Sequence, residues 1–207
     1  MNNALQWSIA SIITICLCIL SYGFADIPVA LWFHALEKNW LYALFTKITL
    51  FGDSTAYLVG GIFLFAVFKN KKTYMAYSGL FLFSTVALSG LTADLIKFVA
   101  GRARPKLYFS EHLYGFDFFH IEHAWTSFPS GHSATALSVA LFLATLYPRW
   151  RFAALFFGIL VAFSRIFLAQ HYISDVIAGS FFGIASSVLL YNHSFKKKLD
   201  VSEPNKI

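Results

Sequence analysis

Long apolar runs separated by short polar segments dominate the hydrophobic pattern of this chain. A helix needs about 20 predominantly apolar residues to cross the hydrocarbon core of a bilayer. Six runs come near that length, although the fourth and fifth are short and would have to extend into their flanks. They cover residues 7–24, 51–68, 73–96, 132–147, 152–168 and 172–191. The pattern predicts an all-α integral membrane bundle of six transmembrane helices, with residues 1–207 forming a single domain.

The amino-acid composition agrees with burial in a bilayer. Hydrophobic residues make up 58% of the chain and charged residues only 13%, whereas soluble domains carry about 25% charged residues. The net charge of +6 could also indicate a nucleic-acid partner. However, the basic residues lie in short clusters between the apolar runs and do not form one basic surface. We therefore expect a membrane environment and no nucleic acid.

The first apolar run could be a cleaved signal peptide. The residues before it, Met1-Asn2-Asn3, lack the positive charge that such a peptide carries, and further apolar runs follow. A retained transmembrane helix is therefore the better interpretation. Cys16 and Cys18 both lie in this run. Because residues two apart on a helix do not face each other, we expect apolar packing there, with neither a disulfide nor a metal site.

The basic clusters predict how the bundle is oriented. Lys and Arg concentrate at 69–72, 148–151 and 196–198, and with six spans these segments share one side. By the positive-inside rule, that side and both termini are cytoplasmic. The links at 26–50, 97–131 and 169–171 then face outward, towards the periplasm of a bacterium or the lumen of a eukaryotic organelle. Segment 26–50 mixes aromatic, apolar and charged residues and indicates an interfacial, partly helical stretch.

Three cations, Lys97, Arg102 and Arg104, follow the third apolar run on the predicted outer side. They could be anchors whose charged ends reach the membrane surface, yet the positive-inside rule predicts few cations on this side. A bound phosphate would account for them, because Arg offers a planar fork of donors and Lys a compact point charge. Asp94 lies three residues before Lys97 and fits a structural ion pair better than a catalytic role.

Ser130-Gly131-His132 stands at the start of the fourth apolar run. Ser130 could simply cap the helix. The same helix N-terminus offers free N–H groups to an anion, and Gly131 would let a phosphate approach the backbone closely. His132, in the first turn, would then be placed to donate a proton.

Arg165, His171 and Asp175 form a third group, where the fifth run ends and the sixth begins. An ionisable residue near the end of an apolar span is costly and usually functional, which singles out Arg165. His171 and Asp175 are four residues apart, so they share one face of a helix. Asp175 could then hold one ring nitrogen and leave the other free to attack. A local pair that only stabilises the start of the helix is the alternative.

Together these groups resemble the three-part signature of the type 2 phosphatidic acid phosphatase (PAP2) superfamily. The likeness spans about residues 94–179. Its first element is Lys97, six intervening residues and Arg104-Pro105, and its second is Pro129-Ser130-Gly131-His132. Its third is Ser164-Arg165, five intervening residues, His171, three intervening residues and Asp175. Every signature position agrees with the family pattern.

The resemblance implies a membrane lipid phosphatase with its active site at the non-cytoplasmic face. His171 would be the nucleophile and form a phosphohistidine, Asp175 would orient it, and His132 would protonate the leaving group. The phosphate oxygens would be held by Lys97, Arg104, Ser130, Gly131 and Arg165, with Arg102 as a possible accessory cation. The resemblance implies no metal or cofactor, since fixed cations can stabilise the developing charge.

The segment 107–128 contains eight aromatic residues. Aromatic side chains favour the bilayer interface, so we expect this segment to lie over the site at headgroup level and to help select substrates. His112, His120 and His123 in the same segment could suggest a metal cluster. Nothing in the pattern around them would orient metal ligands, so we do not expect one.

Several functions remain open at this stage. Within the family, the substrate could be a soluble phosphate ester. A vanadium haloperoxidase uses nearly the same pocket, but its relatives are soluble, and six spans argue against this interpretation. A non-catalytic lipid-binding or transport protein is the alternative from another class, which the intact histidines disfavour. Among lipids, the candidates are undecaprenyl pyrophosphate, lipid A phosphate, phosphatidylglycerol phosphate and phosphatidic acid. The small size favours a bacterial inner membrane and a periplasmic envelope substrate; the sequence does not indicate an oligomeric state.

Overall fold

The computed structural model describes residues 3–37 and 40–202, and helices account for nearly all of its regular structure. The α-helices are α1 (Asn3–Phe24), α2 (Asp26–His34), α3 (Trp40–Ile48), α4 (Ser54–Phe68), α5 (Thr73–Ala100), α6 (Pro105–Glu111), α7 (Gly131–Leu146), α8 (Arg151–Phe167), α9 (Ile173–Leu190) and α10 (Lys196–Ser202). Short turns of other helix types are η1 (Thr49–Gly52), η2 (His123–Trp125), η3 (Pro148–Trp150) and η4 (Tyr191–Phe195). The predicted all-α class is confirmed.

Within the described residues, five helical stretches are long and apolar enough to cross a membrane. They are Ala4–Phe24, Trp40–Phe68, Thr73–Ala100, Pro148–Phe167 and Ile173–Asp200. The second begins earlier than the apolar run predicted, because α3 and η1 continue directly into α4. The remaining predicted span is α7, a shorter apolar helix of 16 residues. Five candidate membrane helices therefore agree with the predicted bundle in length and composition, while the count of six stays a prediction.

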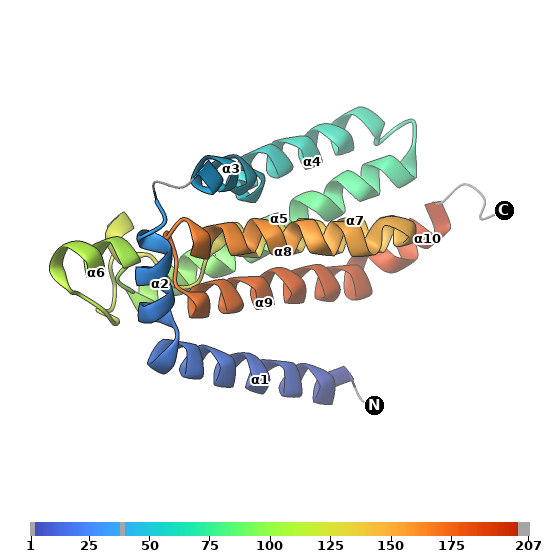
Figure 1. Cartoon of the computed structure of the whole chain (residues 1–207). Helices are drawn as coiled ribbons and strands as arrows, with labels where there is room; N and C mark the ends of the chain where they lie inside the picture. Colours follow the sequence, from blue (N-terminus) through green and yellow to red (C-terminus); the bar gives the residue numbers. More distant parts are fainter. Residues whose placement is uncertain (1–2, 38–39, 203–207) are drawn as a thin grey trace.

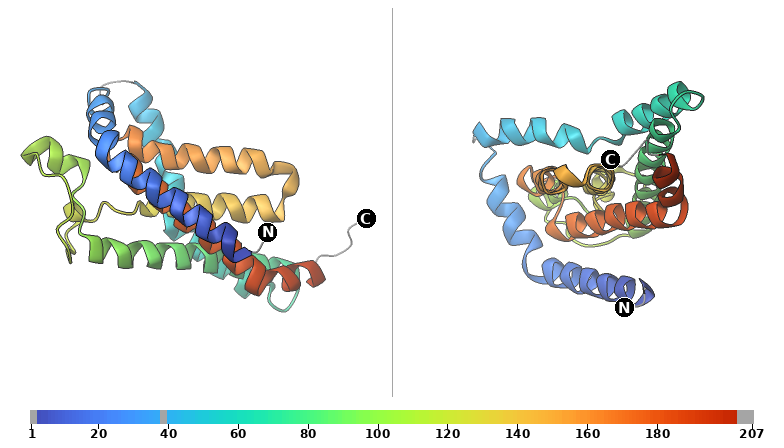
Figure 2. Two further views of the ribbon diagram at one scale, coloured as in Figure 1. Left: turned by 90° about the horizontal axis from the view of Figure 1, so that it is seen from below. Right: turned by 90° about the vertical axis from the view of Figure 1, so that its right-hand side faces the viewer.

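Helix α7 lies inside the bundle and is contacted by α5, α8 and α9. Figure 1 shows these helices side by side, with α4 packed on the outside against α5 and α1 on the outside against α9. The end-on view in Figure 2 shows α1 at the periphery of the bundle. Only 6% of the apolar stretch of α1 is buried inside the protein, against 44% for the stretch that contains α9. A helix surrounded by protein, such as α7, meets little lipid, which fits its short apolar length.

Glycines allow α9 to approach α7 closely. A Cβ added at Gly179 would overlap the carbonyl oxygen of Ser130, and one added at Gly183 would overlap that of Ala134. Small residues at helix contacts let backbones pack closely in membranes, where van der Waals packing is a main source of stability. This contact sets the position of the start of α9 against the start of α7.

The segments that carry the predicted chemistry meet at one end of the bundle. The C-terminal ends of α5 and α8 and the N-terminal ends of α7 and α9 all lie at the end marked by α6 in Figure 1. The basic segments 69–72 and 148–151 lie at the opposite end, together with α10 and the start of α1. The predicted separation of the basic segments from the site is confirmed, and the side of the membrane that each end faces stays a prediction.

Segment 26–50 contains the helices α2 and α3, which agrees with the prediction of a partly helical segment. Helix α2 crosses the end of the bundle between α1 and the segment that leads to α3, as the ribbon in Figure 1 shows. Both helices pack against α8. Phe33 of α2 and Phe167 of α8 are buried in one apolar cluster, which partly buried Phe45 of α3 also joins. This segment therefore covers the end of α8 that carries Arg165.

Candidate active site

A cavity of about 440 Å³ opens at the α6 end of the bundle. Six of the residues predicted from the sequence line it, and they come from five separate parts of the chain. They are Lys97 from α5, Arg104 from the following turn, Gly131 and His132 from α7, Arg165 from α8, and His171 from the α8–α9 link. The structure thus brings Lys97, Arg104 and Arg165 together with both predicted histidines, whereas the roles of these residues stay predictions. Ser130, Asp175 and Arg102 lie behind the cavity wall, all of them buried.

His171 presents its two ring nitrogens to different surroundings. Nδ1 lies 3.5 Å from an Asp175 carboxylate oxygen and 3.5 Å from the Ser127 hydroxyl. Nε2 lies 3.3 Å from Nη1 of Arg104, which lines the cavity. The ring is only 3% exposed, and burial lowers the pKa of His171 to about 3. The neutral ring therefore prevails at pH 7, and with the proton on Nδ1 the lone pair of Nε2 faces the Arg104 N–H at the cavity.

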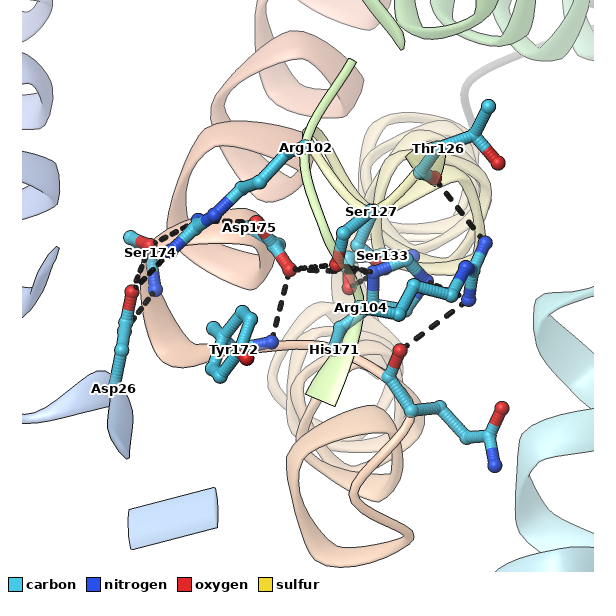
Figure 3. Close-up of polar contacts among 12 residues, drawn as sticks. Asp26, Arg102, Arg104, Thr126, Ser127, Ser133, His171, Tyr172, Ser174 and Asp175 are labelled. Atoms are coloured by element: carbon cyan, nitrogen blue, oxygen red, sulfur yellow. Dashed lines mark hydrogen bonds and ion pairs between the residues drawn. The ribbon is translucent and has the colours of Figure 1, made fainter. Parts of the chain in front are cut away.

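Asp175 is held from three directions, which Figure 3 shows. It accepts hydrogen bonds from the hydroxyl of Ser127 at 2.6 Å and from the backbone N–H of Tyr172 at 2.9 Å. The guanidinium of Arg102 forms an ion pair with its other oxygen. A carboxylate with this many donors stays ionised and keeps one orientation. The sequence predicted the partnership with His171 but not the contribution of Ser127.

The cations differ in how they are anchored. Arg104 donates to the carbonyl oxygens of His123 at 2.8 Å, Thr126 at 3.2 Å and Gln170 at 3.3 Å, so its guanidinium is held rigidly by loop backbone. Burial lowers the pKa of Arg104, yet a guanidinium stays charged in proteins. This rigid cation stands beside the Nε2 atom of the proposed nucleophile.

Arg165 and Lys97 complete the positive wall. Arg165 donates from Nη1 to the hydroxyl of Thr49 at 2.7 Å, and its Nε is buried without a hydrogen-bond partner among the described residues. Lys97 forms the expected ion pair with Asp94 at 2.8 Å. Both side chains line the cavity, and their positive charge suits an acceptor-rich ligand such as a phosphate.

The start of α7 contributes through its backbone and its first side chains. Ser130 caps this helix, because its hydroxyl accepts from the backbone N–H of Ser133 at 3.4 Å and from the Ser133 hydroxyl at 2.9 Å. These are the contacts of a helix cap, and a phosphate contact from Ser130 stays a prediction. A Cβ at Gly131 would lie 2.9 Å from Nζ of Lys97. The absence of a side chain there leaves room for the lysine to reach over the helix N-terminus.

Comparison with known proteins gives the same assignment. A sequence model of the PAP2 superfamily matches residues 78–199, more than half of the chain. The chain belongs to the PAP2 superfamily. The lipid A 1-phosphatase of Rhizobium johnstonii is 36% identical over 197 residues, which is 89% of this chain and 80% of that protein. That of Rhizobium etli is 37% identical over 191 residues, covering 86% and 81%.

Solved structures agree in fold. A transmembrane PAP2-type phosphatidylglycerolphosphate phosphatase from Bacillus subtilis superimposes with a TM-score of 0.64 at 22% identity, covering 93% of this chain and 96% of the other. The LpxE of Aquifex aeolicus superimposes with a TM-score of 0.58 at 20% identity, covering 83% and 98%. The resemblance inferred from the three motifs is thus confirmed, and this PAP2 protein is an integral membrane phosphatase for a lipid.

Arg102 occupies a different position from the one expected of an accessory phosphate ligand. Its side chain is fully buried between the carboxylates of Asp175 and Asp26, away from the cavity lining. Five aromatic rings surround its guanidinium at 4.7–5.9 Å, those of Tyr22, Tyr114, Phe116, Phe128 and Tyr172. The two carboxylates hold the guanidinium in the interior, among these rings.

Residues that the motifs did not reveal support the site from segment 26–52. Thr49 holds Arg165, and a Cβ at Gly52 would lie 2.8 Å from the His132 ring, so η1 packs directly against both. Asp26 binds Arg102 at 2.7 Å. The only sequence signal for them was the charged and polar content of an otherwise apolar, aromatic segment.

His120 and His123 of the loop have different surroundings. His120 pairs with Asp117 at 2.7 Å and stacks on the ring of Trp125, whose ring centroid lies 5.0 Å away. His123 lines the cavity, where the charge of Arg104 lowers its pKa. Within residues 3–37 and 40–202, no group of three His, Cys, Asp or Glu residues is arranged to hold a metal ion. Cys16 and Cys18 are both free thiols.

Proposed function

We propose that this PAP2 protein removes the 1-phosphate of lipid A through a covalent intermediate on His171. The observation that carries the proposal is the position of His171 Nε2 in a cavity walled by Lys97, Arg104 and Arg165. The choice of lipid rests on two relatives named lipid A 1-phosphatase, which are 36% and 37% identical over most of this chain.

The proposed reaction has two displacements at phosphorus. The lone pair of His171 Nε2 attacks the phosphorus atom, and the bond from phosphorus to the lipid oxygen breaks. His132 donates a proton to that oxygen, so the dephosphorylated lipid leaves as an alcohol. Water then attacks the phosphohistidine while His132 accepts its proton, which releases inorganic phosphate and restores both rings. Asp175 offsets the positive charge that develops on the His171 ring during the first step.

The cations supply the electrostatic part of the mechanism. Charge on the three equatorial oxygens of the transferred phosphoryl group grows towards the transition state, and preorganised donors stabilise it without reorganisation. Arg104, Arg165 and Lys97 stand ready for this role, so the proposed chemistry requires no metal. Activity should therefore persist in EDTA, and vanadate should inhibit because it adopts a five-coordinate geometry like that of the transition state.

The proposal also includes an orientation. The basic segments lie at the end opposite the cavity, and the positive-inside rule would place that end in the cytoplasm. The cavity would then face the periplasm of a bacterial inner membrane, the side on which a lipid destined for the outer surface can be modified. The aromatic segment 107–128 would lie at the headgroup level, since Ile121 and Thr126 of this segment line the cavity.

The test uses the purified full-length protein in detergent micelles. The substrates are lipid A carrying phosphates at both ends, phosphatidylglycerol phosphate, phosphatidic acid, undecaprenyl pyrophosphate and a soluble sugar phosphate. We expect phosphate release from lipid A at the highest kcat/KM, with mass spectrometry showing that the 1-phosphate is lost. A His171→Ala variant should release none.

Other outcomes distinguish the alternatives. Faster release from another lipid of the panel would keep the phosphatase mechanism and overturn the substrate. Fast turnover of the sugar phosphate with slow turnover of every lipid would favour a soluble ester. Activity that disappears in EDTA and returns with a divalent ion would contradict the mechanism.

A further inference from the structure

Asp26 is a buried carboxylate at the corner between α1 and α2, outside the cavity. It is 1% exposed and accepts hydrogen bonds from the hydroxyl of Ser21 at 2.7 Å and from the backbone N–H of Ser174 at 3.0 Å. It also forms an ion pair with Arg102 at 2.7 Å. Burying an ionised carboxylate is expensive unless its partners compensate, so this position calls for a reason beyond packing.

Arg102 links Asp26 to the proposed catalytic pair. One terminal nitrogen of its guanidinium binds Asp26 and the other binds Asp175, as Figure 3 shows. Asp175 in turn faces Nδ1 of His171 at 3.5 Å. A continuous line of charge therefore runs from the α1–α2 corner to the nucleophile, through residues that are each no more than 3% exposed.

The charges in this line do not cancel. One guanidinium stands between two carboxylates, so the cluster of Asp26, Arg102 and Asp175 carries a net charge of −1 when all three are ionised. Burial disfavours a charged Arg102, but the two carboxylates outweigh it and raise its pKa, which keeps it protonated. In a dry interior such a charge acts strongly on its neighbours, because the effective dielectric constant is low.

We propose that Asp26 is a positioning residue that prevents Arg102 from neutralising Asp175, and so leaves negative charge for the His171 ring when it becomes cationic. The inference rests on the proposed function, because only a phosphohistidine step places that positive charge on the ring. Without the Asp26 charge, Arg102 could turn both nitrogens towards Asp175, the bidentate geometry that Arg and carboxylates favour. The carboxylate would then stabilise the ring less.

The experiment removes the charge of Asp26 and then restores the net charge of the cluster with a second substitution. Asp26→Asn brings the cluster to zero net charge, whereas the double variant Asp26→Asn with Arg102→Gln returns it to −1 through Asp175 alone. Tyr114→Phe is the matched control, since the Tyr114 hydroxyl also donates to Asp26, at 3.3 Å, but carries no charge. The readouts are kcat, KM, the burst of acid-labile phosphohistidine, and the thermal midpoint in detergent.

We expect Asp26→Asn to lower kcat and the rate of phosphohistidine formation by about 10- to 100-fold, the range known for residues that orient metal ligands through a hydrogen bond. KM should stay close to wild type, because Asp26 does not touch the phosphate. The double variant should regain a substantial part of the lost kcat. Asp26→Glu should retain most of it, and Tyr114→Phe should resemble wild type.

A role in packing alone predicts a different pattern. The double variant would then be slower than Asp26→Asn, because it loses a second buried partner, and kcat would fall together with the thermal midpoint. Either result overturns the inference, as does a rise in KM with unchanged kcat. If Asp26→Asn does not fold, the double variant and Asp26→Glu still carry the comparison with Tyr114→Phe.

Measurements on the wild-type protein distinguish a failure of the proposed function from a failure of the role proposed for Asp26. A wild-type enzyme that turns over phosphate esters without a phosphohistidine would overturn the mechanism and this inference with it. Wild-type protein that forms the adduct from nitrophenyl phosphate but spares lipid A would overturn the substrate alone. An adduct in wild type that Asp26→Asn leaves unchanged in rate would overturn only the role of Asp26.

Discussion

At the scale of single residues, the neighbours of the His171 ring determine which of its nitrogens can act as a nucleophile. The Nδ1 atom of the ring lies beside Asp175 and Ser127, and the Nε2 atom lies beside Arg104. The ring is buried, so it stays neutral at pH 7 and can act as a nucleophile without first losing a proton. His132, in contrast, lies in the first turn of α7 and lines the same cavity. The two histidines are thus suited to different tasks.

The first prediction separates those tasks. His171→Ala should abolish both turnover and the acid-labile, base-stable adduct, because it removes the attacking atom. His132→Ala should lower turnover of the lipid by about 10²- to 10⁴-fold, the range typical of general acid catalysis. A nitrophenyl phosphate, whose leaving group needs no proton, should recover part of that loss. Radiolabelled substrate with rapid quenching measures both. An adduct that persists in His171→Ala but not in His132→Ala would reverse the assignment.

The second prediction concerns pH and stability. The pKa of His171 falls from 6.5 to about 3 on folding because the ring is buried. The unfolded chain therefore binds a proton in that window that the folded protein excludes, and acid favours unfolding. The contribution is fully present above about pH 6.5 and is lost as the pH falls towards 3. Wild type should lose thermal stability more steeply than His171→Asn between pH 7 and pH 4. Parallel curves would show that the ring is not buried in its neutral form.

At the scale of elements, the close contact of α9 with α7 aligns the catalytic groups. The backbone N–H of Ser130, which caps α7, donates to the carbonyl oxygen of Asp175 in α9 at 2.9 Å. Gly179, one turn further along α9, leaves room for this contact. A shift of one helix against the other would move Asp175 and Gly131 apart, and with them the orientation of the nucleophile and the anion-binding end of α7.

The third prediction tests that contact. Gly179→Ala should destabilise the protein by about 1–3 kcal/mol, the usual cost of overpacking, and should lower kcat because α9 is pushed away from α7. Gly90→Ala in α5 is the matched control, since a Cβ there meets nothing within 4 Å. Thermal midpoints in detergent and phosphate release on the same preparations measure the two effects. Equal behaviour of both variants would contradict the role given to this contact.

At the scale of the whole molecule, the cavity and the basic segments between the helices lie at opposite ends. The cavity is at the α6 end, and segments 69–72 and 148–151 are at the other. This polarity, together with the apolar surface of the bundle, fits a protein whose two ends face different compartments. Helix α1 lies at the periphery, yet it leads directly into Asp26 and so into the charged network behind the site.

The fourth prediction concerns that polarity. Single cysteines at Lys71 and Arg149 should resist a membrane-impermeant thiol reagent in intact cells, whereas one at Ser110 should react, in a background without Cys16 and Cys18. Permeabilised cells provide the control, because all three positions should then react. Labelling at Lys71 but not at Ser110 in intact cells would invert the orientation. It would also place the cavity in the cytoplasm.

The sequence alone predicts the helical bundle and a group of residues that line the cavity. Apolar runs require burial in lipid or protein, so the helical bundle follows from hydrophobic pattern and length. Lys97, Arg104, His132, Arg165 and His171 were predicted as one site because their motifs are specific in type and spacing, and all five line one cavity. Where local chemistry is decisive, as in the Asp94–Lys97 pair three residues apart, the prediction was also correct.

The rest depends on contacts between residues far apart in sequence. The partners of Arg102 lie 76 and 73 residues away, so nothing near it in the chain indicated that it would turn inward and not towards a phosphate. Ser127, Thr49 and Asp26 likewise gain their roles from helices that meet only after folding. Periodicity and motif spacing describe each element alone, whereas charge compensation in a buried interior is a property of the assembled bundle.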